Sequence, residues 1–319
     1  MNDGAILVLV TTAVCALLWH ALQTLGYWLY KRVRLKQPAK FSLPGKISLV
    51  LTAIFFACFF YAMLVEPYWP EVTHTIIYSA KLPPASRGFR IAHITDVHCD
   101  ALARLEPRVP DMIAAEKPDL ITFSGDSINS KAGLANCKGL FSALSKIAPT
   151  YVVRGNWDTW FWPTVDLFGG TGVHELQGNS ELMSANGIPI AVTGFPVGAR
   201  HNPDPPGGVA AVKAVLDKVP KSSYSIFIYH YPDLIYPVSE AGADLYLAGH
   251  THGGQVRLPL YGALITLSRY GKRFESGSYL VGNTNLYVSR GVGMEGGGAP
   301  RIRFLCRPEV TIVDIKPKQ

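Results

Sequence analysis

The chain has 319 residues, of which 48% are hydrophobic, so it is long enough for one large domain or two small ones with a sizeable core. Its net charge of +7 comes almost entirely from six basic residues between residues 31 and 46, because 24 basic and 23 acidic residues remain outside this stretch. This balance argues against a nucleic-acid-binding surface, and the three scattered cysteines outside the apolar segments argue against a disulfide framework.

Two apolar segments open the chain. Residues 5–30 and 47–65 contain no charged side chain, and about 20 such residues cross the hydrocarbon core of a bilayer as a helix. Both are predicted to be transmembrane helices, although His20 and Gln23 leave a buried amphipathic helix as an alternative for the first. Because basic loops tend to remain in the cytoplasm, residues 31–46 would be cytoplasmic and both termini extracytoplasmic. We therefore expect a multi-pass protein of the cell membrane, anchored by residues 1–70.

The remainder reads as one domain over residues 88–317, preceded by residues 71–87, which form either a linker or an edge strand. β-rich segments alternate with helix-like ones along it. Strands are predicted at 89–98, 120–126, 150–156, 190–196, 224–230, 245–250, 285–293 and 302–315, and helices at 102–116, 137–147, 209–218 and 234–241. This alternation predicts an α/β domain, and the later strands, which have no helices between them, predict a second sheet packed on the first.

Polar side chains gather where the predicted strands end, and loops at the carboxyl ends of strands are where α/β sheets usually bind ligands. These residues are Asp96, His98, Asp126, Asn156, His230, His250 and His252. Each alone has an ordinary explanation, such as a helix cap, a turn or a buried histidine. Together they indicate metal binding, because Asp-x-His and His-x-His place alternate side chains on one face of an extended segment. Imidazole with carboxylate suits Mn, Fe, Zn or Ni better than Ca or Mg, and seven ligands suit two ions better than one.

The segments DVH, GD, GN, a lone H and GHTHGGQ, in that order from Asp96 to Gln255, resemble the five motif blocks of the calcineurin-like metallophosphoesterases. The resemblance covers most of residues 88–316. It implies a four-layer αββα sandwich and a hydrolase that acts on phosphoric ester or anhydride bonds with two divalent ions, with Mn, Fe or Zn expected. It further implies that Asp96, His98 and His252 hold one ion, that Asn156, His230 and His250 hold the other, and that Asp126 bridges them.

The segments HTHGGQVRLPLYG, YGKRFESGSY and YVSRGVG are most similar to the membrane-associated or exported branch of that family. In two-metal hydrolysis water attacks phosphorus directly, so no serine or cysteine is given a catalytic role, and this includes Cys99. Asp126, Asn156 and Asp158 are the predicted catalytic residues. Gly155 is expected to let the chain turn sharply, and Asn156 to supply a neutral oxygen ligand.

Trp157 departs from the resemblance, because the family usually has a histidine there, oriented by the acid that follows, which is Asp158 in this chain. Tryptophan cannot donate a catalytic proton, so we expect substrates with a good leaving group. The UDP-2,3-diacylglucosamine pyrophosphatases, a lipid A branch of the superfamily, also lack this histidine and are kept as an alternative. Their nucleotide substrate is cytoplasmic, however, whereas the charge pattern places this domain outside. A second alternative is a catalytically idle metal-binding module at the membrane.

Substrate contacts are less defined by the sequence. The aromatic run Trp157, Trp160, Phe161 and Trp162 would line a pocket for an acyl chain or sugar, enter the bilayer interface, or pack under a loop. Arg154, Arg200 and Arg290 are either phosphate-binding or structural arginines. The expected partners are a phosphorylated small molecule or lipid and the membrane, but no nucleic acid. The sequence does not indicate an oligomeric state.

Overall fold

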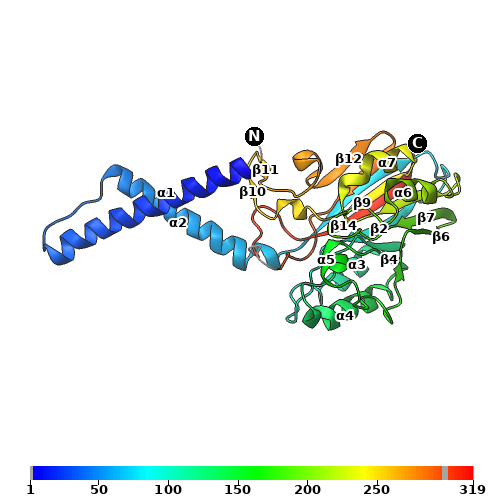
Figure 1. The fold of residues 1–319 in the computed structure, drawn as a ribbon, viewed down its shortest axis with the longest axis horizontal. Helices are drawn as coiled ribbons and strands as arrows, with labels where there is room; N and C mark the ends of the chain where they lie inside the picture. The colour runs from blue at the N-terminus through cyan, green and yellow to red at the C-terminus, as the bar shows by residue number, and fades with distance from the viewer. Residues whose placement is uncertain (1–2, 297–300, 319) are drawn as a thin grey trace.

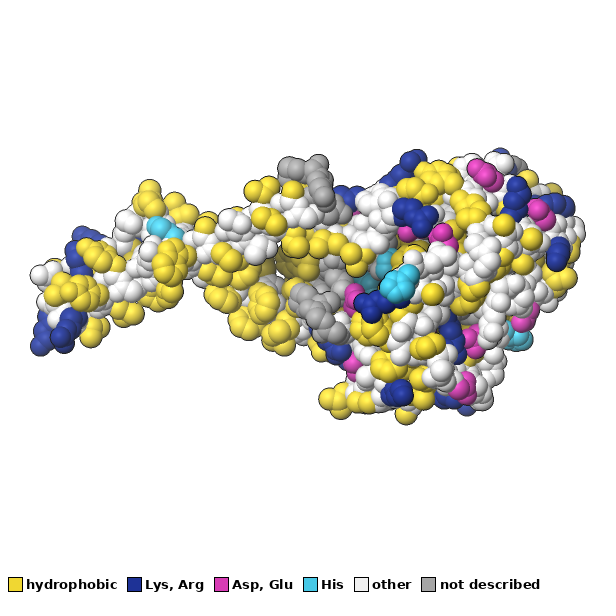
Figure 2. All heavy atoms as spheres, viewed as in Figure 1, with side chains coloured by type: hydrophobic (Ala, Val, Ile, Leu, Met, Phe, Trp, Pro, Cys, Tyr) yellow, Lys and Arg dark blue, Asp and Glu magenta, His cyan; other side chains and the backbone are white. Residues whose placement is uncertain are grey.

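The computed structural model describes residues 3–296 and 301–318. It begins with two helices, α1 (Asp3–Leu29) and α2 (Leu43–Leu64), which form a hairpin that projects from the rest of the molecule (Figure 1). The helices pack closely where Gly45 meets Thr24, because a Cβ on this glycine would lie 2.7 Å from the threonine methyl carbon. The basic residues of the connecting segment gather at the far tip of the hairpin (Figure 2).

Both helices are long and apolar enough to cross a membrane, and only 6% and 11% of their most apolar windows are buried. Large apolar side chains such as Leu22 and Ile54 are more than half exposed. The first helix is therefore not the buried amphipathic helix that His20 and Gln23 left open. By length and composition, the two helices could span a membrane, and the first could instead be a signal sequence.

The domain contains two six-stranded sheets. The first sheet has the order β1-β14-β2-β3-β4-β5, and every neighbouring pair is parallel except β14 and β2. The strands are β1 (Glu71–Ser79), β2 (Phe89–Ile94), β3 (Leu120–Phe123), β4 (Thr150–Val152), β5 (His174–Glu175) and β14 (Glu309–Pro317). The second sheet has the order β12-β13-β9-β8-β7-β6, with antiparallel strands only at its two edges. Its strands are β6 (Asn179–Ala185), β7 (Ile188–Gly194), β8 (Tyr224–Ile228), β9 (Leu245–Ala248), β12 (Gly277–Val281) and β13 (Thr284–Val288).

Successive side chains of a strand point to opposite faces of its sheet, and the buried apolar ones form three cores. On β2, Ile91 points between the two sheets, while Ile94 packs against the layer that contains α3 (Val109–Glu116) and α4 (Leu134–Leu144). On β8, Ile226 points between the sheets and Phe227 packs against the layer of α6 (Gly208–Leu216) and α7 (Ile235–Glu240). The result is helix, sheet, sheet, helix, which confirms the predicted four-layer αββα sandwich.

Of the two alternatives for residues 71–87, the structure has the edge strand, β1, which pairs with β14 in register Glu71 to Glu309. Two other local predictions differ from the structure. The helix predicted from residue 102 begins only at Val109, because Pro110 is tolerated in the first turn of a helix but not inside one. The short helix α5 (Asn156–Phe161) was not predicted.

Candidate metal centre and active site

The predicted ligands come from five loops of both sheets. Asp96 and His98 follow β2, Asp126 follows β3, Asn156 begins α5 just after β4, and the three remaining histidines follow β8 and β9. Five of the seven have a left-handed backbone: Asp96 (φ 52°), His98 (42°), Asp126 (64°), His250 (68°) and His252 (50°). This conformation is uncommon for residues other than glycine, and such strain clusters at functional sites, where the surrounding fold compensates for it.

Five side chains meet at the centre of the cluster. Oδ2 of Asp126 lies 3.5 Å from Nε2 of His98 and 3.3 Å from Nε2 of His230. Oδ1 of Asp96 lies 3.2 Å from Nε2 of His252 and 3.8 Å from Nε2 of His230. The ligand atoms form two groups, each within 4.8 Å, namely Asp96, His98 and His252, and Asp96, Asp126 and His230. Each carboxylate therefore lies between histidines of both groups.

Unsatisfied buried atoms in this cluster fit a divalent metal ion. Oδ1 of Asp96, Oδ1 of Asn156 and Nε2 of His230 are buried and make no hydrogen bond. Such atoms are rare in folded proteins unless they bind an ion or water. The Nε2 atoms of His98 and His252 lie only 3.3 Å apart, a separation that a shared cation would stabilise. The Nδ1–H of His230 donates to the carbonyl of Ser124 at 3.0 Å, which directs Nε2 toward the carboxylates.

The protonation of the cluster also suits metal binding, which needs ionised carboxylates and neutral imidazoles. Burial lowers the pKa of His98 to about 4 and that of His250 to about 3. Burial opposes ionisation of Asp96 and Asp126, but neighbouring histidines outweigh it and hold both pKa values below the ordinary range. Burial also disfavours a charged His230, yet Asp126 and Asp96 raise its pKa to about 9, so an ion that binds there displaces a proton.

One predicted histidine ligand, His250, lies outside these two groups. Nε2 of His250 lies 3.3 Å from the carbonyl of Leu267, and its ring packs on Tyr231 with centroids 3.9 Å apart. Both His250 and Asn156 line the pocket beside the cluster.

Asp158 lies under the cluster. Its carboxylate accepts backbone N–H bonds from Asp126 and Ser127, each at 2.9 Å, and from Gly155 at 3.0 Å. Burial, with the nearby charge of Asp126, raises its pKa to about 7. None of these contacts involves the ring of Trp157, so in this structure Asp158 positions the loop of Asp126 and does not orient residue 157.

Gly155 was expected to allow a sharp turn, but the structure requires a glycine there for a different reason. Its backbone has φ −83° and ψ −171°, which any residue can adopt. A Cβ there would lie 2.2 Å from Oδ1 of Asp126, so only glycine lets β4 and the loop after β3 come this close. The same Oδ1 accepts the N–H of Trp157 at 2.8 Å.

A pocket of about 360 Å³ opens beside the cluster. It is lined by Asp126, Asn156, Trp157, Trp160, Pro203, Tyr231, Asp233, His250, His252, Leu267, Arg269 and Glu295. The indole N–H of Trp157 donates to Oε1 of Glu295 at 3.3 Å, and that of Trp160 to the carbonyl of Gly198 at 3.0 Å. Within the aromatic run, only Trp157 and Trp160 line the pocket, whereas Trp162 packs against the core of the first sheet.

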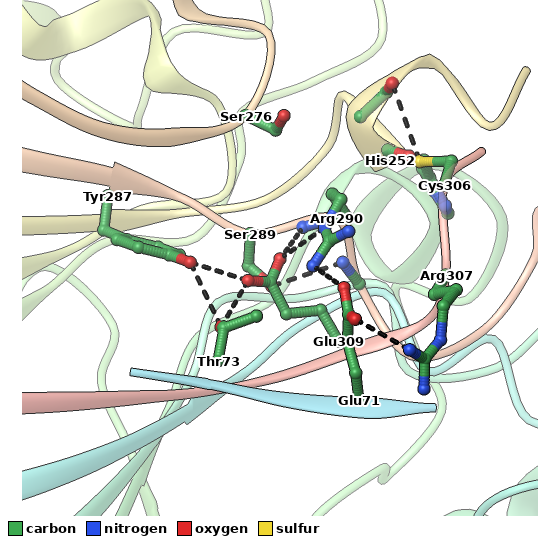
Figure 3. A network of polar contacts seen from close by, with 12 residues as sticks. Glu71, Thr73, His252, Ser276, Tyr287, Ser289, Arg290, Cys306, Arg307 and Glu309 are labelled. Carbon is green, nitrogen blue, oxygen red and sulfur yellow. Dashed lines mark hydrogen bonds and ion pairs between the residues drawn. The ribbon is translucent and has the colours of Figure 1, made fainter. Parts of the chain in front are cut away.

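The arginines of this pocket differ from those singled out in the sequence. Nε of Arg154 binds Glu175 at 2.7 Å, and Arg290 binds Glu309 at 3.1 Å and also Glu71 (Figure 3). Neither lines the pocket, and Arg200 stacks 5.6 Å from the ring centroid of Phe161.

Arg269 is the arginine among the described lining residues, and sequence reasoning missed it together with Tyr231, Asp233 and Glu295. The segment from residue 257 to 273 contains several basic residues, and nothing in its local pattern separates Arg269 from the others.

Comparisons with known proteins agree with this geometry. Residues 89–254 match the sequence profile of the family described as calcineurin-like phosphoesterase. The chain is 32% identical over 266 residues to the uncharacterized metallophosphoesterase YkuE of Bacillus subtilis (strain 168), which covers 80% of this chain and 89% of that protein. It is 30% identical over 268 residues to the phosphodiesterase YaeI of Escherichia coli (strain K12), and the match covers 81% of this chain and 92% of that protein. The chain therefore belongs to the calcineurin-like phosphoesterase family and is a metal-dependent hydrolase of phosphoric esters.

Proposed function

We propose that this protein is a membrane-anchored phosphohydrolase that uses two divalent ions to cleave a lipid-linked phosphate diester or anhydride. The observation that carries the proposal is the position of Asp126 between His98 and His230, which suits a carboxylate that bridges two ions. Bound ions would supply Lewis-acid activation of water and of the phosphate. Mn, Fe or Zn fits the mixture of imidazole and carboxylate best.

Side chains of the pocket would bind the phosphate and determine which leaving groups are accepted. Asn156 offers a buried neutral oxygen, which moderates negative charge where a phosphate must enter. Arg269 is the described arginine that lines the pocket, and its guanidinium suits phosphate oxygens. Because Trp157 cannot donate a proton, the leaving group must be stable as an anion. A diester with a good leaving group or a pyrophosphate meets this requirement, and one relative of this chain is named a phosphodiesterase.

The hairpin of α1 and α2 supports the membrane anchor. Its apolar side chains face outward, and its basic residues lie at the tip farthest from the domain (Figure 2). If both helices span the membrane, the positive-inside rule puts this tip in the cytoplasm and the domain outside. A cysteine-free variant with Lys40→Cys or Lys318→Cys tests this in intact cells with a membrane-impermeant maleimide. We expect labelling only at position 318. The opposite pattern would place the pocket in the cytoplasm and favour the UDP-2,3-diacylglucosamine pyrophosphatase-like alternative.

Activity is tested with purified, Mn-loaded protein on aryl monoesters, aryl diesters, nucleotide sugars and phospholipids. We expect Asp126→Asn to lose most bound metal and nearly all hydrolysis. The matched control is Asp166→Asn, which changes a carboxylate that is 68% exposed and pairs with Lys138. Full metal content with unchanged turnover in Asp126→Asn would refute the dinuclear proposal. Wild-type protein that binds metal but hydrolyses none of the panel would favour the idle module.

A further inference from the structure

A short hairpin after the last metal ligand carries unusually exposed apolar residues. Strands β10 (Arg257–Leu258) and β11 (Gly262–Ala263) are joined by a tip in which Leu260 is fully exposed and Tyr261 is 39% exposed. Leu260 also has a left-handed backbone, with φ 65°. A leucine held outward in this way has no partner among the described residues to explain it, and strain of this kind suggests a functional role.

Two more exposed leucines share this conformation. Leu267 has φ 54° and is 67% exposed, and Leu305 has φ 52° and is 49% exposed. All three belong to the segments that connect the metal site to the helical hairpin. Exposed apolar surface on a soluble domain often marks contact with a partner or a membrane.

Backbone contacts attach these segments to the end of α2. The N–H of Arg257 donates to the carbonyl of Phe304 at 2.9 Å, and the Phe304 ring packs edge-on against Tyr61 of α2, with centroids 6.3 Å apart. Arg303 donates its N–H to the carbonyl of Ala62 at 2.9 Å. The β10–β11 hairpin therefore lies where α2 leaves the proposed membrane span, and Figure 1 shows it where the helices meet the domain.

Leu305 is held at the same place. Its N–H donates to Oε2 of Glu66 at 2.9 Å, and this glutamate directly follows the span.

Aromatic and basic side chains lie just after α2 and at the β10–β11 tip. Tyr68 and Trp69 follow α2 and are 46% and 53% exposed, and Arg307 stacks 4.3 Å from the Trp69 ring centroid. Nζ of Lys272 lies 3.8 Å from the ring centroid of Tyr261. Trp, Tyr, Lys and Arg are the residues that anchor proteins at the membrane–water interface. Hydrophobic side chains continue from the helices onto the adjoining end of the domain (Figure 2).

The same surface reaches the active-site pocket. Leu267 lines the pocket, and its carbonyl oxygen lies 3.3 Å from Nε2 of His250. Arg269, two residues later, also lines the pocket and has a side chain that is 53% exposed. The exposed apolar side chain of Leu267 and the positive charge of Arg269, which is proposed to bind phosphate, therefore lie two residues apart on one segment.

We infer that residues 258–267, together with Leu305, form a bilayer-contacting surface that sits in the interfacial layer of the membrane and presents the metal pocket to the phosphate of a lipid headgroup. The inference rests on the proposed membrane anchor and extends it from tethering to substrate delivery. The lipid surface is the occupant because the surface is continuous with the end of a helix proposed to span that membrane. The substrate class it selects is a phosphate-bearing amphiphile whose chains remain in the leaflet.

The depth at which position 260 enters the bilayer tests the proposed surface independently of enzymatic activity. The full-length chain with Cys15→Ser and Cys58→Ser receives Leu260→Cys, carries an environment-sensitive fluorophore there, and is reconstituted in phosphatidylcholine and phosphatidylglycerol vesicles with spin-labelled lipid. The matched control is Leu182→Cys, which lies on edge strand β6 and is 63% exposed. We expect lipid quenching at position 260 and not at 182. Equal, weak quenching at both positions, or crosslinking of two copies through position 260, would overturn the inference.

Activity gives a second, separable readout. For Leu260→Ser we expect an unchanged rate on a water-soluble aryl diester and a rate on vesicle-borne phospholipid that falls by about tenfold, since part of a leucine's burial free energy is lost. Leu182→Ser should change neither rate. A loss on both substrates, or on neither, contradicts the inference. Absence of aryl-diester hydrolysis in the wild-type protein would instead contradict the proposed function and leave the depth result to decide the surface.

Discussion

The thiol of Cys306 donates a hydrogen bond to the backbone carbonyl of the proposed metal ligand His252 at 3.2 Å (Figure 3). The backbone N–H of the same cysteine donates to the carboxylate of Glu66, two residues beyond the end of α2. One residue thus joins the end of the helical hairpin to the loop that carries His252. Because His252 has a left-handed backbone, its geometry depends on such supporting contacts.

This contact predicts a graded effect of substitution at position 306. Cys306→Ala removes the donor and leaves the His252 carbonyl without this bond, whereas Cys306→Ser keeps a hydroxyl donor. Partners that orient metal ligands typically contribute about 10- to 100-fold in metal affinity, and we expect the lower end because this contact acts through the backbone. Competition with a chelator measures the affinity. Cys137→Ala, which changes a buried thiol on α4, controls for lost packing. Equal affinities for Cys306→Ala and Cys306→Ser would show that the bond does not position His252.

Gly155→Ala should disturb metal binding although it adds only a methyl group. The new Cβ would lie 2.2 Å from Oδ1 of Asp126, so this carboxylate or the loop of Asp126 must move. We expect a large loss of bound metal, read by elemental analysis, with the protein still folded by circular dichroism. Gly139→Ala is the control, because no atom lies within 4 Å of its added Cβ, and alanine in a helix is favoured by about 1 kcal/mol. Normal metal content in Gly155→Ala would mean that the loops separate without consequence.

Trp157→His should broaden leaving-group tolerance. A positioned general acid contributes about 10²- to 10⁴-fold, and most when the leaving group is poor. Glu295, which accepts the indole N–H of Trp157 at 3.3 Å, is placed to orient the new imidazole, whereas Asp158 is held by backbone N–H groups. We expect the ratio of kcat/KM for alkyl and aryl phosphate diesters to rise.

Trp157→Phe is the control for that experiment, because it removes the indole N–H without supplying a proton donor. The ratio of kcat/KM cancels losses that are common to all substrates. A ratio that is unchanged in metal-replete Trp157→His would show that residue 157 does not reach the leaving group. A ratio that rises equally in Trp157→Phe would show that space alone, and not a proton, limits alkyl substrates.

Glu309 predicts part of the acid sensitivity of folding. Burial would raise its pKa, but Arg290, Thr73 and Tyr287 bind the carboxylate and hold the pKa below the ordinary value (Figure 3). Because the folded pKa is depressed, the stabilisation is present above the unfolded pKa of about 4.5 and is lost as the pH falls through the folded value. Glu309→Gln should lower the free energy of unfolding near neutral pH by about 3 kcal/mol, since it breaks a buried ion pair.

Denaturant unfolding of both proteins in the same detergent, from about pH 7 to pH 3, measures this effect. The difference between wild type and Glu309→Gln should shrink toward low pH, because the wild-type carboxylate becomes protonated. The metal-site carboxylates titrate in both proteins and cancel in the comparison. A difference that is constant over this range would mean that Glu309 keeps its charge state, and the predicted linkage would then be wrong.

The sequence alone determined the family, the layered α/β fold and the Asp and His residues that form the candidate metal centre. These features are local. A β-branched run followed by Asp or His predicts a polar residue at the end of a strand, and the order of five such ends identifies the family. Asp96, His98, Asp126, His230 and His252 meet in the structure because parallel strands bring their carboxyl ends to one edge. The two apolar helices were also visible, since their length and lack of charge are properties of continuous segments.

Only the tertiary structure decided which polar side chains lie at the site. Arg154 and Arg290 are bound to Glu175, Glu71 and Glu309 outside the pocket, whereas Arg269 lines the pocket and pairs with Asp204 at 3.1 Å. Likewise, Asp158 binds the loop of Asp126, β1 pairs with the last strand, and Gly155 is needed for the close approach of two loops. The physical reason is the same in each case. The direction of a charged side chain, and the space beside a glycine, depend on partners that are brought together only when the two sheets pack, and no local pattern encodes that choice.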